Sequence, residues 1–189
     1  MKLFKSIMSW SLTVIIAVVI AMLIDIFLFQ PHKVVGDSMY PTLKSGELGI
    51  MSKINHTFGI APNYGDIVII DSRVTHKHTV LDDLMDSIQY NIISSLIFKN
   101  ENHSYWIKRV IGKSGDVLEF KNGKVYRNGK ALNEPYVKDP MITGPDDVRV
   151  SVPKDCVFVM GDNRNNSTDS RIIGSVPLCN VVGHLAITF

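Results

Sequence analysis

The sequence has few cysteines and little net charge, and it lacks internal repeats, so several classes of protein are excluded. Its 189 residues include 2 cysteines, Cys156 and Cys179, which lack the Cys-x-x-Cys spacing of redox and zinc sites. They fit one disulfide outside the cell or two buried thiols. The formal net charge of +2 gives no support to a nucleic-acid partner. The length predicts one compact domain with an appendage.

The appendage is an N-terminal segment without charge. Residues 6–24 contain no charged side chain, and the apolar character continues to Phe29, which is long enough for a helix to cross a bilayer. The run ends in Phe29-Gln30-Pro31, without the small residues of a signal-peptide cleavage site. We therefore predict an uncleaved membrane anchor over residues 7–29. Lysines before it favour a cytoplasmic position for residues 1–6.

The remainder, residues 30–189, has the pattern of an antiparallel β domain. Asn122-Gly123 and Asn128-Gly129 each separate two short strand-like runs. Asn-Gly favours two-residue hairpin turns, because both turn positions need a positive φ, so the pairs predict a three-stranded meander. Further apolar runs predict strands over 66–70, 157–160 and 181–189. Strands do not alternate with helices as a parallel sheet requires, so we predict a mainly β fold.

One segment has helical periodicity instead. Apolar residues recur every three or four positions from Leu81 to Leu96, and Thr79 with Asp82 resembles a capping box. We predict a helix over about 80–98. Two interpretations of its apolar stripe stay open, because the stripe can pack on the β domain or lie on a membrane surface. The first is favoured, since the polar face is acidic and membrane-binding faces are usually basic.

A very polar stretch, Gly161–Arg171, follows an apolar strand-like run. It contains two aspartates and two arginines, and this density of opposite charges predicts a rigid loop stabilised by its own ion pairs. The expected carboxylates are Asp162 and Asp169, and the expected guanidinium partners are Arg164 and Arg171. A calcium loop beginning at Asp162 is excluded, because Ile173 stands where the terminal glutamate ligand belongs. Rigid polar loops at strand ends often carry functional sites.

Two further blocks accompany this loop. Gly36–Thr42 is a turn that contains a serine, and Tyr105–Gly112 is an apolar strand with two adjacent cations. The three blocks, in this order behind an apolar N-terminal segment, resemble the type I signal peptidases, in the short form of Gram-positive bacteria. The resemblance covers nearly the whole chain. It implies a serine–lysine endopeptidase that removes signal peptides from exported preproteins, with residues 30–189 outside the cytoplasm and residues 72–104 as an insertion.

The resemblance implies that Ser38 is the nucleophile, and a serine nucleophile needs a base. Lys108 is a suitable base, because Trp106 and Val110 share its strand face and desolvation disfavours the ammonium form. Arg109 cannot act in this way, since a guanidinium does not deprotonate in proteins. The 6 histidines include no recognisable triad context. Two of them, His76 and His78, could share a strand face, but without a third ligand we expect no metal site and no cofactor.

The resemblance also implies roles for further residues. Ser167 orients the neutral lysine amine through its hydroxyl, which adds no charge. The oxyanion is bound near Gly36 and the backbone amide of Ser38. Apolar walls that admit only small side chains are formed by Val34, Met39, Leu43, Trp106 and Ile107. A substrate strand with small residues at alternate positions, −3 and −1, would fit these walls. The expected partners are preproteins and membrane lipid.

Three alternative functions remain open at this stage. A self-cleaving serine–lysine repressor of the LexA-like kind has a similar β fold, but the anchor and the absence of a DNA-binding region disfavour it. A non-catalytic assembly factor that resembles signal peptidases would be expected to replace Ser38 or Lys108, and both residues are present. A membrane-tethered β domain that only binds partners is the third alternative. Cleavage of a preprotein distinguishes all three from the peptidase.

Overall fold

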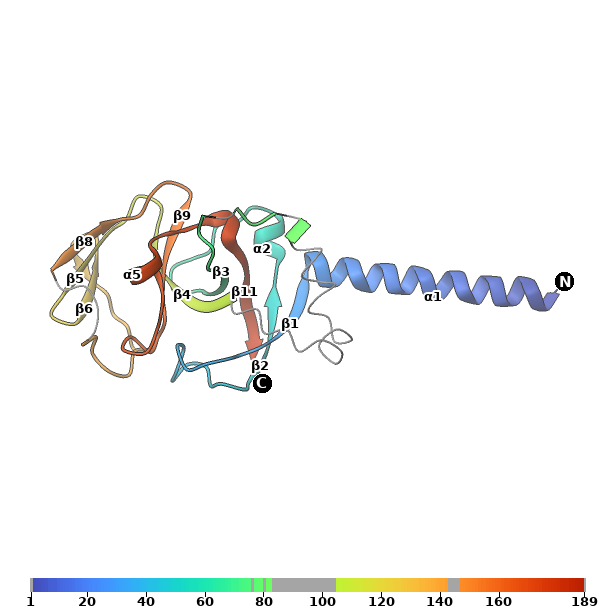
Figure 1. Ribbon diagram of the computed structural model, residues 1–189, viewed down its shortest axis with the longest axis horizontal. Coiled ribbons are helices and arrows are strands. Elements are labelled where there is room, and N and C mark those ends of the chain that lie inside the picture. Colours follow the sequence, from blue (N-terminus) through green and yellow to red (C-terminus); the bar gives the residue numbers. More distant parts are fainter. Residues whose placement is uncertain (1, 76, 80, 83–104, 143–146, 189) are drawn as a thin grey trace.

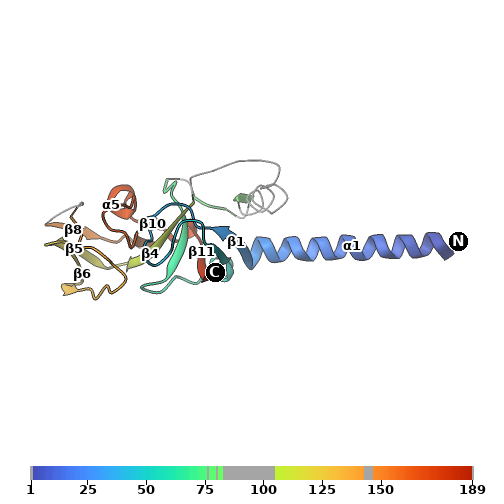
Figure 2. The ribbon, with the colours of Figure 1, turned by 90° about the horizontal axis from the view of Figure 1, so that it is seen from below.

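The computed structural model describes residues 2–75, 77–79, 81–82, 105–142 and 147–188. A long helix, α1 (Lys2–Phe27), projects from one end of a β body, and the N-terminus lies at its far tip (Figure 1). The C-terminus lies within the body, near β2 (Leu48–Ser52) (Figure 1). The view from below also shows α1 extending away from the end of the β body near β1 (Figure 2). The predicted mainly β fold is confirmed.

Seven strands form the larger sheet, and all of their pairings are antiparallel. Their order in the sheet is β1 (Phe29–Lys33), β2, β11 (Val181–Thr188), β3 (Ile67–Asp71), β4 (Tyr105–Lys113), β9 (Cys156–Met160) and β10 (Val176–Pro177). The smaller, antiparallel sheet has the order β7 (Lys130–Ala131), β6 (Lys124–Arg127), β5 (Val117–Lys121) and β8 (Val148–Ser151). Short helices are α2 (Ile54–Thr57), α5 (Ser170–Ile173) and η1 (Leu178–Asn180).

The predicted meander is confirmed in β5, β6 and β7. Its two turns have the expected backbone, because Asn122 and Asn128 have φ values of 51° and 52° and each following glycine also has a positive φ. The continuous apolar run of β9 is explained by burial on both faces. Phe158 and Met160 pack in the core next to the smaller sheet, whereas Val157 and Val159 pack in the core of the larger one. Strand β9 therefore connects both cores and ends at the polar loop.

The N-terminal helix ends before the boundary that the sequence suggested for the anchor. Helix α1 stops at Phe27, and Phe29 is already the first residue of β1. Among the residues that the structure describes, no helix reaches the length and apolar character needed to cross a membrane. The anchor over residues 7–29 stays a prediction.

Of the segment 72–104, the structure describes residues 72–75, 77–79 and 81–82. Thr79 and Asp82 form the expected capping contacts, since both the backbone N and Oγ1 of Thr79 donate to Asp82 Oδ2 at 2.7 Å. The rest of the helix predicted over 80–98 lies outside the described residues. The two cysteines are free thiols, each half-buried, so the structure contains two thiols and not a disulfide.

Candidate active site

Ser38 and Lys108 meet although 70 residues separate them in the chain. Lys108 lies in the middle of β4, opposite Val68 of β3, and its side chain is only 4% exposed. Ser38 follows Gly36, whose φ of 84° turns the chain sharply after β1. Lys108 Nζ donates a hydrogen bond to Ser38 Oγ at 2.7 Å. The two residues that the sequence singled out are therefore in direct contact.

The environment of Lys108 favours its neutral form. Burial lowers the pKa of Lys108 from 10.5 to about 8, opposed by the negative charges of Asp169 and Asp162 and assisted by the positive charge of Arg171. Trp106, on the same strand face, has its ring centre 5.7 Å from Nζ. A lysine with this pKa can accept a proton near neutral pH.

The polar loop 161–171 packs directly against the serine turn. Asn163 holds that turn twice, because its backbone N donates to Ser38 O at 3.0 Å and its Nδ2 donates to Asp37 O at 3.1 Å. A Cβ added at Gly161 would overlap the Ser38 carbonyl oxygen and the Ser167 side chain. Glycine is therefore required at position 161 by the close approach of the loop to Ser38. Sequence reasoning did not identify the contacts of Asn163.

Asp169 is the centre of a second network in this loop. Arg171 donates to it from Nε and from Nη2, both at 2.8 Å, as the expected pair predicted. Ser167 Oγ and the Gly161 backbone N donate to Asp169 Oδ2 at 2.8 and 3.0 Å. Burial alone would raise the pKa of Asp169, but the Arg171 guanidinium and these donors hold it below its usual value. In the structure the Ser167 hydroxyl thus donates its hydrogen bond to Asp169.

The expected pairing of Asp162 with an arginine of its own loop is wrong. Asp162 accepts from Arg109 Nε at 2.8 Å and Nη2 at 2.6 Å, and also from Thr42 Oγ1 at 2.5 Å. Arg164 pairs with Glu134, whose two oxygens accept at 3.0 and 2.5 Å. The arginine next to the lysine therefore joins the loop to β4. In the sequence, the charge of Arg109 in a largely apolar strand was the feature that indicated a partner for this side chain.

Four of the five predicted wall residues lie together. Val34, Met39 and Leu43 form one buried cluster, and Ile107 packs against it. Trp106 packs instead against the core cluster that contains Val68 and Val110. The backbone N of Gly36 donates to Ser45 Oγ at 3.2 Å, so this amide is engaged within the protein.

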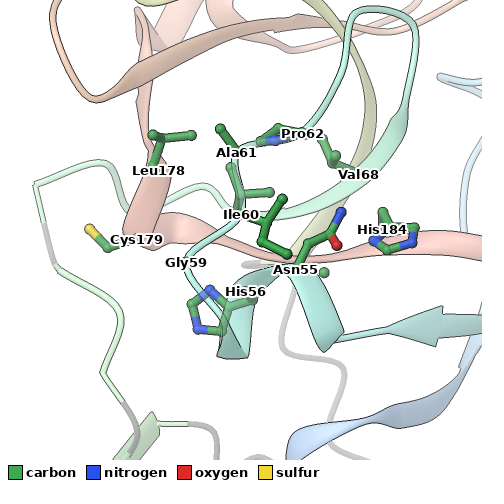
Figure 3. A pocket seen from close by; sticks show the side chains of 12 residues that line it. Asn55, His56, Gly59, Ile60, Ala61, Pro62, Val68, Leu178, Cys179 and His184 are labelled. Atoms are coloured by element: carbon green, nitrogen blue, oxygen red, sulfur yellow. The ribbon is translucent and has the colours of Figure 1, made fainter.

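A cavity of about 270 Å³ does not include Ser38 or Lys108 in its lining. Figure 3 shows the side chains that line it. Its lining comes from α2, the chain after it, β3, η1 and β11, and its side chains are mainly apolar. The lining comprises Asn55, His56, Gly59, Ile60, Ala61, Pro62, Val68, Leu178, Cys179, Val181, Gly183 and His184. Across the described part of the chain, no three His, Cys, Asp or Glu residues are grouped so as to hold a metal ion. One member of the considered histidine pair, His76, lies outside the described residues.

Known proteins resemble this chain along most of its length. The family described as signal peptidase, peptidase S26, matches residues 7–189. A probable signal peptidase I-1 of Synechocystis sp. is 35% identical over 174 residues, which is 92% of this chain and 78% of that protein. Signal peptidase I S of Bacillus subtilis is 37% identical over 176 residues, 88% of this chain and 79% of that protein. A crystal structure of a signal peptidase I from Enterococcus faecalis has a TM-score of 0.45 at 25% identity, over 66% of this chain and 97% of that one.

These matches define the class as a serine peptidase, in agreement with a part-buried serine–lysine contact in a β domain. The chain belongs to the signal peptidase family, peptidase S26. It is an enzyme of the signal peptidase I type, which cleaves signal peptides from preproteins.

Proposed function

We propose that the protein cleaves signal peptides with Ser38 as nucleophile and Lys108 as general base. The observation that carries this proposal is the 2.7 Å contact between Lys108 Nζ and Ser38 Oγ. Neutral Nζ takes the hydroxyl proton while Oγ bonds to the carbonyl carbon of the scissile peptide. The C–N bond then breaks, and the ammonium returns the proton to the leaving amine. Water, deprotonated by the same amine, hydrolyses the acyl-enzyme and restores Ser38.

The lowered pKa decides whether this base is useful at pH 7. With a pKa of about 8, about a tenth of Lys108 is neutral at pH 7. An ordinary lysine with a pKa of 10.5 would be neutral in roughly 0.03% of molecules. Burial therefore raises the neutral fraction of Lys108 at pH 7 roughly 300-fold. This supports Lys108 as the general base, because a residue that stays charged cannot accept the proton.

A pH–rate profile tests the proposal. The rate kcat/KM should rise about tenfold per pH unit below pH 8 and level off above it, because only neutral Lys108 accepts the proton. The measurement is kcat/KM on a preprotein between pH 5.5 and 10, with the thermal midpoint followed in the same buffers. A rise centred near 6.5 that disappears when one histidine is replaced would assign the base to that histidine and reject Lys108.

Ser167 is proposed to position the base through Asp169. Its hydroxyl binds Asp169, whose charge raises the pKa of Lys108 against the larger effect of burial. We expect Ser167→Ala to lower kcat and to displace the pH–rate midpoint, while the melting temperature changes little, because Arg171 still pairs with Asp169. Asp169→Ala should instead lower both activity and melting temperature, since it removes the carboxylate that pairs with the buried Arg171 guanidinium. Unfolding of Ser167→Ala would mean that its role is structural.

The buried apolar cluster supports selection of small substrate side chains. Val34, Met39 and Leu43 gather close to the nucleophile, since Met39 is its direct neighbour in the chain. We propose that an extended signal peptide places its −1 and −3 side chains against this cluster, because alternate residues of a strand face one side. The backbone N of Ser38 would donate to the oxyanion, and Gly36 would contribute only if its amide left Ser45.

Helix α1 is proposed to anchor the peptidase in the cell membrane, with the β body outside the cytoplasm. The charge-free run of 6–24 supports this role, and the lysines that precede it support the orientation. The anchored chain should stay in the membrane fraction after alkaline carbonate extraction, and a variant that lacks residues 2–27 should be released. Release of the full chain would contradict the anchor without affecting the proposed chemistry.

A further inference from the structure

A polar cavity of about 220 Å³ borders the serine turn. Neighbouring side chains diverge at this turn, because Met39 is buried in the apolar cluster while Tyr40 is exposed and lines the cavity. Asn163, which holds the backbone carbonyls of Asp37 and Ser38, also lines it. The two residues that follow the nucleophile therefore face different environments, an apolar cluster and a polar cavity.

The walls of the cavity are fixed by alternate residues of the polar loop. Asn163 holds the serine turn on one side. Asn165 holds the facing segment on the other side, because its Oδ1 accepts from Ile142 N at 2.7 Å and its Nδ2 donates to Pro140 O at 3.0 Å. One rigid loop thus sets the distance between the two walls, as a substrate subsite requires.

The charges that line the cavity are not equivalent. Asp162 and Arg164 are buried and each is neutralised by a partner, Arg109 and Glu134 respectively. Lys138 is exposed and its Nζ lies 5.5 Å from the ring centre of Tyr40, two residues after the nucleophile. The Lys138 ammonium is therefore the cation that faces the cavity on the side of the serine turn.

Asp139 lines the same cavity and carries the opposite charge. It is exposed and follows Lys138, so the two residues compete in their effect on a charged ligand. The position of Lys138 Nζ over the Tyr40 ring places its positive charge beside the serine turn. A preference for acidic substrate residues would therefore show that Lys138 dominates the cavity, and a preference for basic ones would show that Asp139 does.

We propose that this cavity binds the first residues of the mature protein, on the leaving-group side of the cut, and that Lys138 favours an acidic side chain there. The assignment rests on the proposed role of Ser38. The end of a signal peptide is small and uncharged and suits the apolar cluster. The cavity walled by Tyr40, Asn163 and Asn165 is polar and would suit polar or charged side chains at the start of the mature chain.

The test uses one preprotein-derived peptide in which the first and second residues after the cut are changed in turn to Asp, Asn or Lys. The full chain, in detergent, is compared with Lys138→Gln, Lys138→Glu and the control Lys130→Glu, an exposed lysine of β7 in the other sheet. We expect kcat/KM of the native protein to be about two- to fivefold higher for Asp than for Asn, and lower again for Lys. The difference should arise in KM and should shrink at high salt.

Lys138→Gln should remove this preference and Lys138→Glu should reverse it, while the control keeps it. The control should cleave the Asn peptide at the native rate. For each Lys138 variant the rates on the Asp and Lys peptides are divided by its own rate on the Asn peptide, so that a change in overall rate does not affect the comparison. An unchanged Asp-to-Lys ratio in Lys138→Glu overturns the proposal. A native preference for the Lys peptide also overturns it and assigns the cavity to Asp139. Cleavage by Ser38→Ala would instead reject the proposed nucleophile, so the two failures are distinguishable.

Discussion

Replacing Ser38 with alanine is expected to reduce kcat/KM for preprotein cleavage by about 10⁴-fold or more, as for other serine peptidases that lose the nucleophile. The hydroxyl is the atom that forms the acyl-enzyme, so no covalent route remains. The assay uses detergent-solubilised protein and a preprotein with Ala at −3 and −1. Sequencing the N-terminus of the product locates the cut.

Ser151→Ala is the matched control for this variant. Ser151 is an exposed serine at the end of β8, in the sheet that does not carry Lys108, so its removal should leave the rate unchanged. Both variants should melt within a few degrees of the native protein, because Ser38→Ala removes the hydrogen bond between the hydroxyl and Lys108 and keeps the backbone bond to Asn163. Cleavage by Ser38→Ala at more than a tenth of the native rate, at the same peptide bond, would reject the mechanism.

Replacing Lys108 with arginine or with alanine is expected to be nearly as damaging, with losses of kcat/KM of about 10³-fold or more. Nucleophile and base act as a unit, so the loss of either one removes the route. Arginine is the sharper test, because it keeps the charge and the length but does not lose a proton in proteins. Measured between pH 6 and 10, Lys108→Arg should show no rise in rate near pH 8.

Lys124→Arg is the corresponding control, since Lys124 is exposed on β6. It should keep the native rate and the native pH profile. Circular dichroism and a thermal melt establish that Lys108→Ala is folded, which is expected because the charged form of Lys108 is disfavoured by burial in the native state. A folded Lys108→Arg that retains the native pH profile would show that another residue is the base.

The sequence predicted those parts of the fold whose signals are local. The two Asn-Gly pairs predicted the meander because they demand a particular turn, and the apolar run at 157–160 predicted β9. It did not predict β1, which contains Pro31. The structure explains this, because β1 is an edge strand, where a proline without an N–H is tolerated. Strand β8 is short and has no buried residue, so it gave no apolar signal.

The site was predictable to the extent that chemistry restricts the residue type. A lysine on an apolar strand alone would more often extend its charge to solvent or pair with an acid. Its combination with Ser38 and the polar loop, which the family resemblance supplied, indicated a base. The pairing of Asp162 with Arg109 had no local signal, because 53 residues separate them. The nearest arginine in sequence, Arg164, is used by Glu134 instead. Ion pairs between distant segments depend on the tertiary structure, and a charge pattern along the chain does not determine them.

The contacts that build the site join segments far apart in the chain. Ser38 and Lys108 are 70 residues apart, and Thr42 and Asp162 are 120 residues apart. Contacts of such separation form only as the whole topology is completed. We therefore expect a nascent or half-folded copy to have no proteolytic activity toward itself or its neighbours. Recovery of cleavage after refolding therefore reports the completed topology, whereas recovery of strand content alone does not.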